Sequence, residues 1–152
     1  MDLQMNKILL VALLCSSMMG LSHAADTAPM KSDPVWLTES RASIKANKYD
    51  QAIKQLQLAN ETNSADWNNL MGYSLRKKQP PDLVSAEKYY QAALKIDPGH
   101  RGALEYYGML KLTNNDLPGA EALLAKLDKV CTFGCEEYSD LKEAIQKYKS
   151  KK

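Results

Sequence analysis

Apolar and polar residues recur with a helical period through residues 82–108. Apolar side chains stand at i, i+4, i+7 and i+8 in the order Ala86, Tyr90, Ala93 and Leu94, which places them on one face of a helix. Asp97-Pro98-Gly99 interrupts the pattern, because proline cannot continue the helical hydrogen-bond ladder. A second apolar face follows at Ala103, Leu104, Tyr107, Gly108 and Leu110. The stretch therefore predicts two helices joined by a tight turn.

The same pattern recurs with a period of 34 residues. It aligns four columns: Ala52, Ala86 and Ala120; Tyr49, Leu83 and Leu117; Leu56, Tyr90 and Leu124; and Ala59, Ala93 and Leu127. Periodicity and helix breakers together predict helices over 35–46, 50–61, 65–78, 82–95, 101–114, 117–130 and 136–149. No stretch shows sustained strand alternation. The expected fold is an all-α array of antiparallel helix pairs.

On these columns the chain resembles the tetratricopeptide repeat family. The matching repeat-packing positions are Trp36, Ala52, Gly72, Ala86, Tyr90, Ala93, Pro98, Gly108 and Ala120. The resemblance implies a helix-turn-helix solenoid over 34–149, with repeats at about 33–64, 65–100 and 101–134 and a capping helix at 136–149. It departs from the family at Ser40, which stands where glycine is usual, and at a two-residue insertion around Gln79-Pro80-Pro81. Trp36 matches the family's buried tryptophan, whereas Trp67 is out of register with Gly72 and is expected to be partly exposed.

The first 24 residues have the composition of a secretory signal peptide. Lys7 precedes an apolar run from Ile8 to Leu14, and Ser22-His23-Ala24 supplies a small-x-small cleavage site. We expect cleavage after Ala24, a flexible lead-in over 25–33 and a periplasmic location. A retained membrane anchor is the alternative, although the apolar run is short for a span of about 20 residues.

Charge and chemistry limit the function classes. The chain has 20 Lys and Arg against 18 Asp and Glu, a net charge of +2, and nucleic-acid-binding domains usually show a stronger basic excess. His100 is expected to be a solvated turn residue, and no phosphate-binding glycine loop or zinc-ligand spacing is present. We therefore expect no catalytic activity, no metal, no cofactor and no nucleic-acid partner.

Cys131 and Cys135 stand four residues apart with Gly134 between them. In an exported protein such a pair most simply forms a disulfide. A redox-active pair is the sharper alternative, but the C-x-x-C spacing of thioredoxin-type sites is absent. The expected use is to fix the angle of the capping helix.

The resemblance implies a concave groove lined by the first helix of each pair. Its positions map to Leu37, Arg41, Ile44 and Lys45, to Asn69, Leu70, Tyr73, Arg76 and Lys77, and to Glu105, Tyr106, Met109 and Thr113. Aromatic, methionine and basic side chains of this kind suit an extended or helical peptide. Glu105 and Met109 stand where a clamp for a terminal carboxylate would need basic residues, so that clamp is disfavoured.

Three functions follow as hypotheses. The first is a non-catalytic adaptor or assembly factor that binds another protein or peptide through the groove. The second is a thiol-disulfide protein acting through Cys131 and Cys135. The third is a structural protein whose end near Trp36 stacks on another copy.

Overall fold

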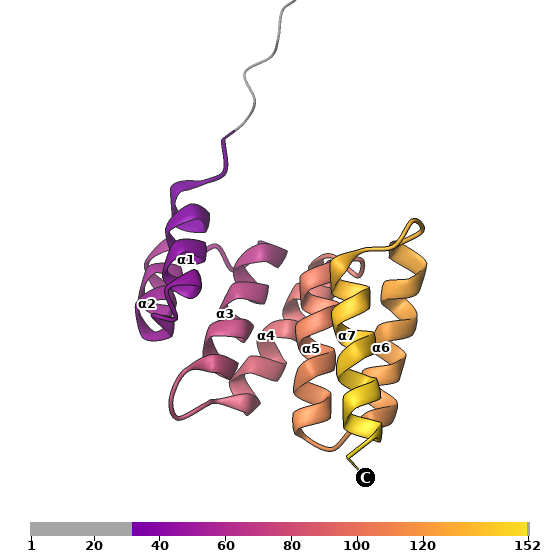
Figure 1. The fold of residues 1–152 in the computed structure, drawn as a ribbon. Helices are drawn as coiled ribbons and strands as arrows, with labels where there is room; N and C mark the ends of the chain where they lie inside the picture. Colours follow the sequence, from indigo (N-terminus) through magenta and orange to yellow (C-terminus); the bar gives the residue numbers. More distant parts are fainter. Residues whose placement is uncertain (1–31, 152) are drawn as a thin grey trace, which may run out of the picture. The chain divides into compact units, whose positions relative to one another are not determined.

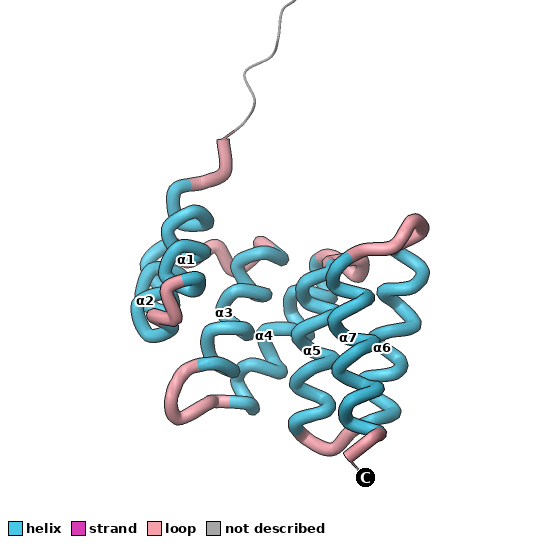
Figure 2. The backbone as a smooth tube through the Cα atoms, in the orientation of Figure 1, coloured by secondary structure: helices cyan, strands magenta, loops and turns pink. Residues whose placement is uncertain are grey.

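The structure, a computed structural model, describes residues 32–151. The predicted signal peptide and the lead-in up to residue 31 lie outside the described residues. Within 32–151 the chain forms seven α-helices and no strand (Figures 1 and 2). They are α1 (Val35–Lys45), α2 (Tyr49–Ala59), α3 (Ala65–Lys77), α4 (Leu83–Ile96), α5 (Arg101–Thr113), α6 (Leu117–Val130) and α7 (Glu136–Lys149). Every bound lies within two residues of its prediction, and the all-α class is confirmed.

Side-chain caps fix where four of the helices begin. The capping residue in each accepts a hydrogen bond from the backbone N–H three residues later, which satisfies one of the free donors at a helix start. The four caps are Ser64, Asp82, His100 and Asp116. Pro98 lies two residues beyond the end of α4, where its missing N–H interrupts no helical hydrogen bond.

Two turns within helix pairs share one conformation. Asn47 joins α1 to α2 and Asn115 joins α5 to α6, and both adopt a left-handed backbone with φ of 57° and 60°. Asparagine is one of the few residues that tolerate this region well. The two positions are 115 − 47 = 68 residues apart, which is twice the repeat period. The first and third helix pairs therefore share a turn conformation, whereas the second pair has Pro81 at the corresponding position.

The helices pack as consecutive pairs. α1 with α2, α3 with α4 and α5 with α6 make the most extensive contacts, and the first helices of neighbouring pairs also touch, α1 with α3 and α3 with α5. α7 covers the last pair by packing on both α5 and α6. The first pair contacts the other described helices only through α3. This packing is consistent with a helical repeat.

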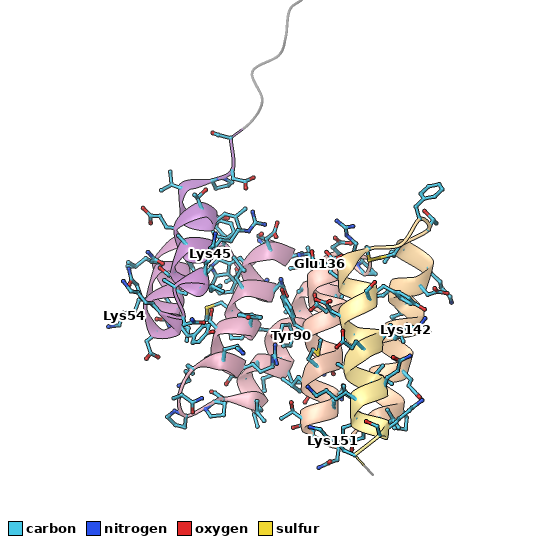
Figure 3. The ribbon with its side chains drawn as sticks, viewed as in Figure 1. Lys45, Lys54, Tyr90, Glu136, Lys142 and Lys151 are labelled. Atoms are coloured by element: carbon cyan, nitrogen blue, oxygen red, sulfur yellow. A yellow bond between two sulfur atoms is a disulfide. The ribbon has the colours of Figure 1, made fainter. Side chains whose placement is uncertain are left out.

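Part of the repeat columns lies at the centre of the core, whereas the column of Tyr49, Leu83 and Leu117 is only partly buried. Ala52, Ala86 and Ala120 have no exposed surface, and neither do Tyr90 and Ala93. Tyr90 lies among the helices, whereas Lys54 and Lys142 project outward (Figure 3). Small residues are needed where helices approach closely, as at Gly72, where an added Cβ would lie 2.8 Å from the Tyr90 ring.

The two tryptophans differ from the expectation. Trp67 is buried, with 4% of its surface exposed, whereas Trp36 is only partly buried against the core. The prediction of a partly exposed Trp67 was therefore wrong. The physical reason is a hydrogen bond across helices: the indole Nε1 donates to the Leu56 carbonyl of α2 at 2.7 Å, and the ring meets Tyr89 of α4 edge-on. A buried indole N–H needs such a partner.

Cys131 and Cys135 lie at disulfide-bonding distance, with the sulfur atoms 2.05 Å apart. The pair joins the end of α6 to the start of α7, and Gly134 between them has a φ of 84°. The bridge thus holds the covering helix at its first turn.

We expect replacement of both cysteines by serine to lower the free energy of unfolding by at most about 2 kcal/mol, because the chain-entropy contribution of so short a loop is small. Urea titration of the double variant under the same buffer conditions as the parent measures this. A loss well above that value would mean that the bridge also maintains the packing of α7.

Candidate functional site

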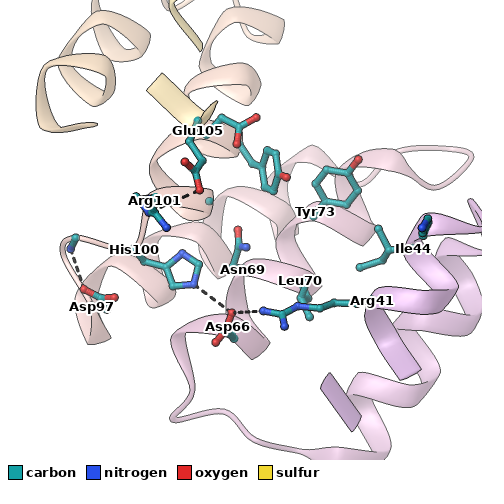
Figure 4. A pocket seen from close by; sticks show the side chains of 15 residues that line it. Arg41, Ile44, Asp66, Asn69, Leu70, Tyr73, Asp97, His100, Arg101 and Glu105 are labelled. Carbon is teal, nitrogen blue, oxygen red and sulfur yellow. Dashed lines mark hydrogen bonds and ion pairs between the residues drawn. The ribbon is translucent and has the colours of Figure 1, made fainter. Parts of the chain in front are cut away.

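A cavity of about 580 Å³ lies against the first helices of the three pairs (Figure 4). The lining residues of α1 stand at positions i, i+3 and i+4, and those of α3 stand at positions i, i+3, i+4 and i+7. Each set therefore shares one face of its helix. α5, the turn before it and the start of α7 complete the wall. The lining residues are Arg41, Ile44 and Lys45 from α1, Asp66, Asn69, Leu70 and Tyr73 from α3, Asp97, Gly99 and His100 from the turn, Arg101, Gly102, Glu105 and Tyr106 from α5, and Glu137 from α7.

One end of the cavity is organised around the Asp66 carboxylate. Arg41 Nη2 lies 3.2 Å from Asp66 Oδ1, and His100 Nε2 lies 3.6 Å from the same oxygen (Figure 4). The other ring nitrogen, His100 Nδ1, accepts the Ala103 N–H at 3.1 Å and so carries no proton. This places the proton of a neutral imidazole on Nε2, facing Asp66. Arg41 also pairs with Asp33 at 3.0 Å, so its charge is already shared by two carboxylates.

The middle of the site is a row of aromatic rings. Tyr73 lies between Tyr49 of α2, at a centroid distance of 6.3 Å, and Tyr106 of α5, at 4.7 Å. The Arg76 guanidinium stands 5.5 Å from the Tyr73 ring and 5.9 Å from the Tyr106 ring, within cation–π distance of both. Burial raises the pKa of Tyr106 to about 12, and the nearby Glu105 carboxyl contributes to this increase. The phenol therefore stays neutral.

The far end of the cavity holds a buried carboxyl group. Glu105 is only 6% exposed. Burial raises its pKa to about 8, with further increases from Asp140, Glu137 and Glu136 of α7 and an opposing effect from Arg76 of α3. The group is therefore largely protonated at neutral pH in the unliganded chain.

This shift makes stability depend on pH. The carboxyl ionises near its ordinary value of 4.5 when unfolded but near 8 when folded, so between these values the folded chain binds more protons. The free energy of unfolding is therefore expected to fall as pH rises through that interval. Urea unfolding across the interval measures the slope, and in Glu105→Gln, which cannot ionise, the slope should flatten. An unchanged slope in the variant would contradict the assignment to Glu105.

Eight of the thirteen residues predicted for the groove line this one cavity: Arg41, Ile44, Lys45, Asn69, Leu70, Tyr73, Glu105 and Tyr106. Arg76 does not line it but supports the tyrosine rings. Met109 is partly buried and packs against the core. Lys77, one helical turn beyond Tyr73, lies in a separate hollow with Tyr49 and Asn47, because the last turn of α3 faces the α1–α2 connection.

Seven lining residues were not predicted as part of the groove: Asp66, Asp97, Gly99, His100, Arg101, Gly102 and Glu137. Asp66 carried a usable signal, since it precedes Asn69, Leu70 and Tyr73 by three, four and seven residues and so shares their helix face. The expectation of a solvated His100 was wrong: its side chain is 15% exposed, because one nitrogen caps α5 and the other faces Asp66. Glu137 reaches the site only through the packing of α7 on α5.

Residues 32–151 hold no group of three or more His, Cys, Asp and Glu arranged to bind a metal ion. Nor does any helix in that range have the length and apolar character needed to cross a bilayer. No family model matches the chain, and no curated protein matches it.

Proposed function

We propose that the chain is an exported, tetratricopeptide-type repeat protein that binds a peptide segment of another protein and acts as a non-catalytic adaptor or assembly factor in the bacterial cell envelope. The observation that carries the proposal is the cavity lined by α1, α3 and α5, with eight of the thirteen predicted groove residues in its wall. Its aromatic rings and charges of both signs are the features that peptide-binding grooves use.

The repeat assignment draws support from the core. Ala52, Ala86, Ala93 and Ala120 of the 34-residue columns have no exposed surface, and the first helices of the pairs lie next to one another. In such arrays each unit contacts mainly its neighbours and leaves an extended face for a ligand. The aromatic row suits this role because tyrosine supplies a large contact area at low entropic cost.

Site-specific photocrosslinking tests the function. A photoreactive phenylalanine analogue replaces Tyr106 in the cavity in one variant and Leu58 in another, whose side chain is 87% exposed on α2 outside the cavity wall. In cells, the Tyr106 position should form a discrete adduct with another protein, and the Leu58 position should not. Adduct formation at Leu58 alone, or at neither position, would overturn the proposal.

The double variant Tyr73→Ala, Arg76→Ala provides a second control in the same cells. It removes one ring of the aromatic row and the guanidinium stacked on it, and should abolish the Tyr106 adduct. Its helicity, measured by circular dichroism, should stay near that of the parent. The redox hypothesis is tested by a further variant. Replacement of both cysteines by serine should leave the adduct unchanged if binding does not depend on the disulfide.

Export is testable independently of binding. N-terminal sequencing of the protein from a periplasmic fraction should begin at Ala25. A chain that keeps its first 24 residues would instead support the retained anchor.

A further inference from the structure

Two hydrogen-bond acceptors in the cavity wall have no donor among residues 32–151. Among residues 32–151, the Glu105 carboxyl accepts no hydrogen bond and forms no ion pair. Asn69 Oδ1 is likewise buried without a partner. Each residue is only 6% exposed, and both line the cavity. A buried acceptor in a protein is nearly always satisfied, so the Asn69 oxygen requires an explanation.

Asn69 and Glu105 line the same cavity from the neighbouring helices α3 and α5. A Cβ added to Gly102 would lie 3.1 Å from Asn69 Nδ2, so the Asn69 amide of α3 sits over Gly102 of α5. Glu105 follows Gly102 by three residues and is therefore its neighbour on the same face of α5. Figure 4 shows Asn69, Tyr73 and Glu105 facing the same space.

The charges around Glu105 favour a cation. Glu136, Glu137 and Asp140 of α7 all act on it with negative charge, and the opposing cation is Arg76 of α3. Arg76 is held against the tyrosine rings, and Glu137 is shared with Arg101 at 3.7 Å. An anionic group at this end would be repelled by the carboxylates, whereas an ammonium or guanidinium group would supply the missing donors.

We propose that this end of the cavity receives the side chain of a lysine or arginine from the bound peptide. Glu105 is the charged acceptor, Asn69 Oδ1 is a second acceptor, and the rings of Tyr73 and Tyr106 pack against the methylene stem. The inference rests on the proposed peptide-binding function, which it deepens by naming the chemistry of the partner. Lys45 and Arg41 line the opposite end of the cavity, where their positive charge suits an acidic residue elsewhere in the same peptide.

Selection from a library of random displayed peptides tests the inference. The parent chain should enrich peptides with lysine or arginine at one fixed position, and Glu105→Gln should lose that preference. Enriched peptides without a basic position would overturn the inference and leave the proposed function standing. The absence of any enrichment would overturn both.

Affinity measurements on one enriched peptide sharpen the result. Replacing its basic residue by norleucine should weaken binding to the parent by about tenfold or more, because the ion pair with Glu105 and its hydrogen bonds are then lost. The same replacement should have little effect on binding to Glu105→Gln. Asn69→Ala should weaken binding of the basic peptide by a smaller factor. Equal affinities of the two peptides for the parent would contradict the inference.

A pH series and a small cation complete the test. Affinity for the basic peptide should rise between about pH 6 and pH 9 in the parent as Glu105 ionises, since a lysine stays charged over that range. Glu105→Gln should show no such rise. If n-butylammonium bound as tightly as the peptide, the ligand would be a free amine and the peptide assignment would be wrong.

Discussion

Trp67→Ala is expected to lower the free energy of unfolding by about 3–5 kcal/mol. The substitution empties the volume of a residue that is 96% buried and removes the hydrogen bond from Nε1 to the Leu56 carbonyl. It also removes the edge-on contact with Tyr89, so α2, α3 and α4 all lose packing at one point. Because domains of this size are stable by about 5–15 kcal/mol, much of the total would be lost.

Urea unfolding followed by circular dichroism measures the loss, and Trp36 keeps a fluorescence signal in the variant. Trp67→Phe is the matched control, since it keeps most of the apolar volume and removes the indole donor. It should cost less than the alanine variant, because the Leu56 carbonyl still accepts from the Asn60 N–H. A loss below about 1 kcal/mol in Trp67→Ala would mean that the residue is not buried in solution.

Leu141→Ala is expected to cost about 2–5 kcal/mol, because it opens a cavity between α7 and α5. Leu141 has no exposed surface, and an added Cβ at Gly108 would lie 2.5 Å from its Cδ2 atom. Leu58→Ala, at an exposed position, should change stability by no more than about 0.5 kcal/mol. Thermal or urea unfolding of the two variants gives the comparison.

A double-mutant cycle makes this contact specific. Gly108→Ala alone should destabilise the chain, since its methyl group would overlap the Leu141 side chain. In the Leu141→Ala background the same change should be neutral or stabilising, because the overlap is gone and alanine favours a helix over glycine by about 1 kcal/mol. Additive effects of the two substitutions would show that the residues do not touch.

Much of the helical architecture was predictable because its causes are local. The 34-residue columns mark which face of each helix is buried, and breakers such as Pro98 mark where helices end. Which of the two tryptophans is buried was not predictable from such local patterns. Trp67 is buried because its indole meets a carbonyl eleven residues earlier in another helix, and no local periodicity encodes that contact.

The candidate site was predictable in position but not in chemistry. Helical spacing within α1, α3 and α5 is enough to collect Arg41, Asn69, Tyr73 and Glu105 on one surface. The raised pKa of Glu105 depends on burial and on acidic residues of α7, more than thirty positions later, which approach only when α7 packs on α5. Electrostatic environments built across helices in this manner leave no pattern in either segment alone.

The attachment of the first helix pair through α3 alone has a consequence for how a ligand would enter. An end unit with a neighbour on one side opens at a lower free energy than an internal unit, so amide protons of α1 and α2 should exchange with solvent faster than those of α5 and α6. Hydrogen-exchange mass spectrometry reads this directly. Because α1 carries Arg41 and Lys45 of the cavity wall, a peptide that spans the cavity to Glu105 would bind the closed unit in preference to the open one. Ligand binding would then slow exchange at the end of the array, where the unliganded chain is least protected.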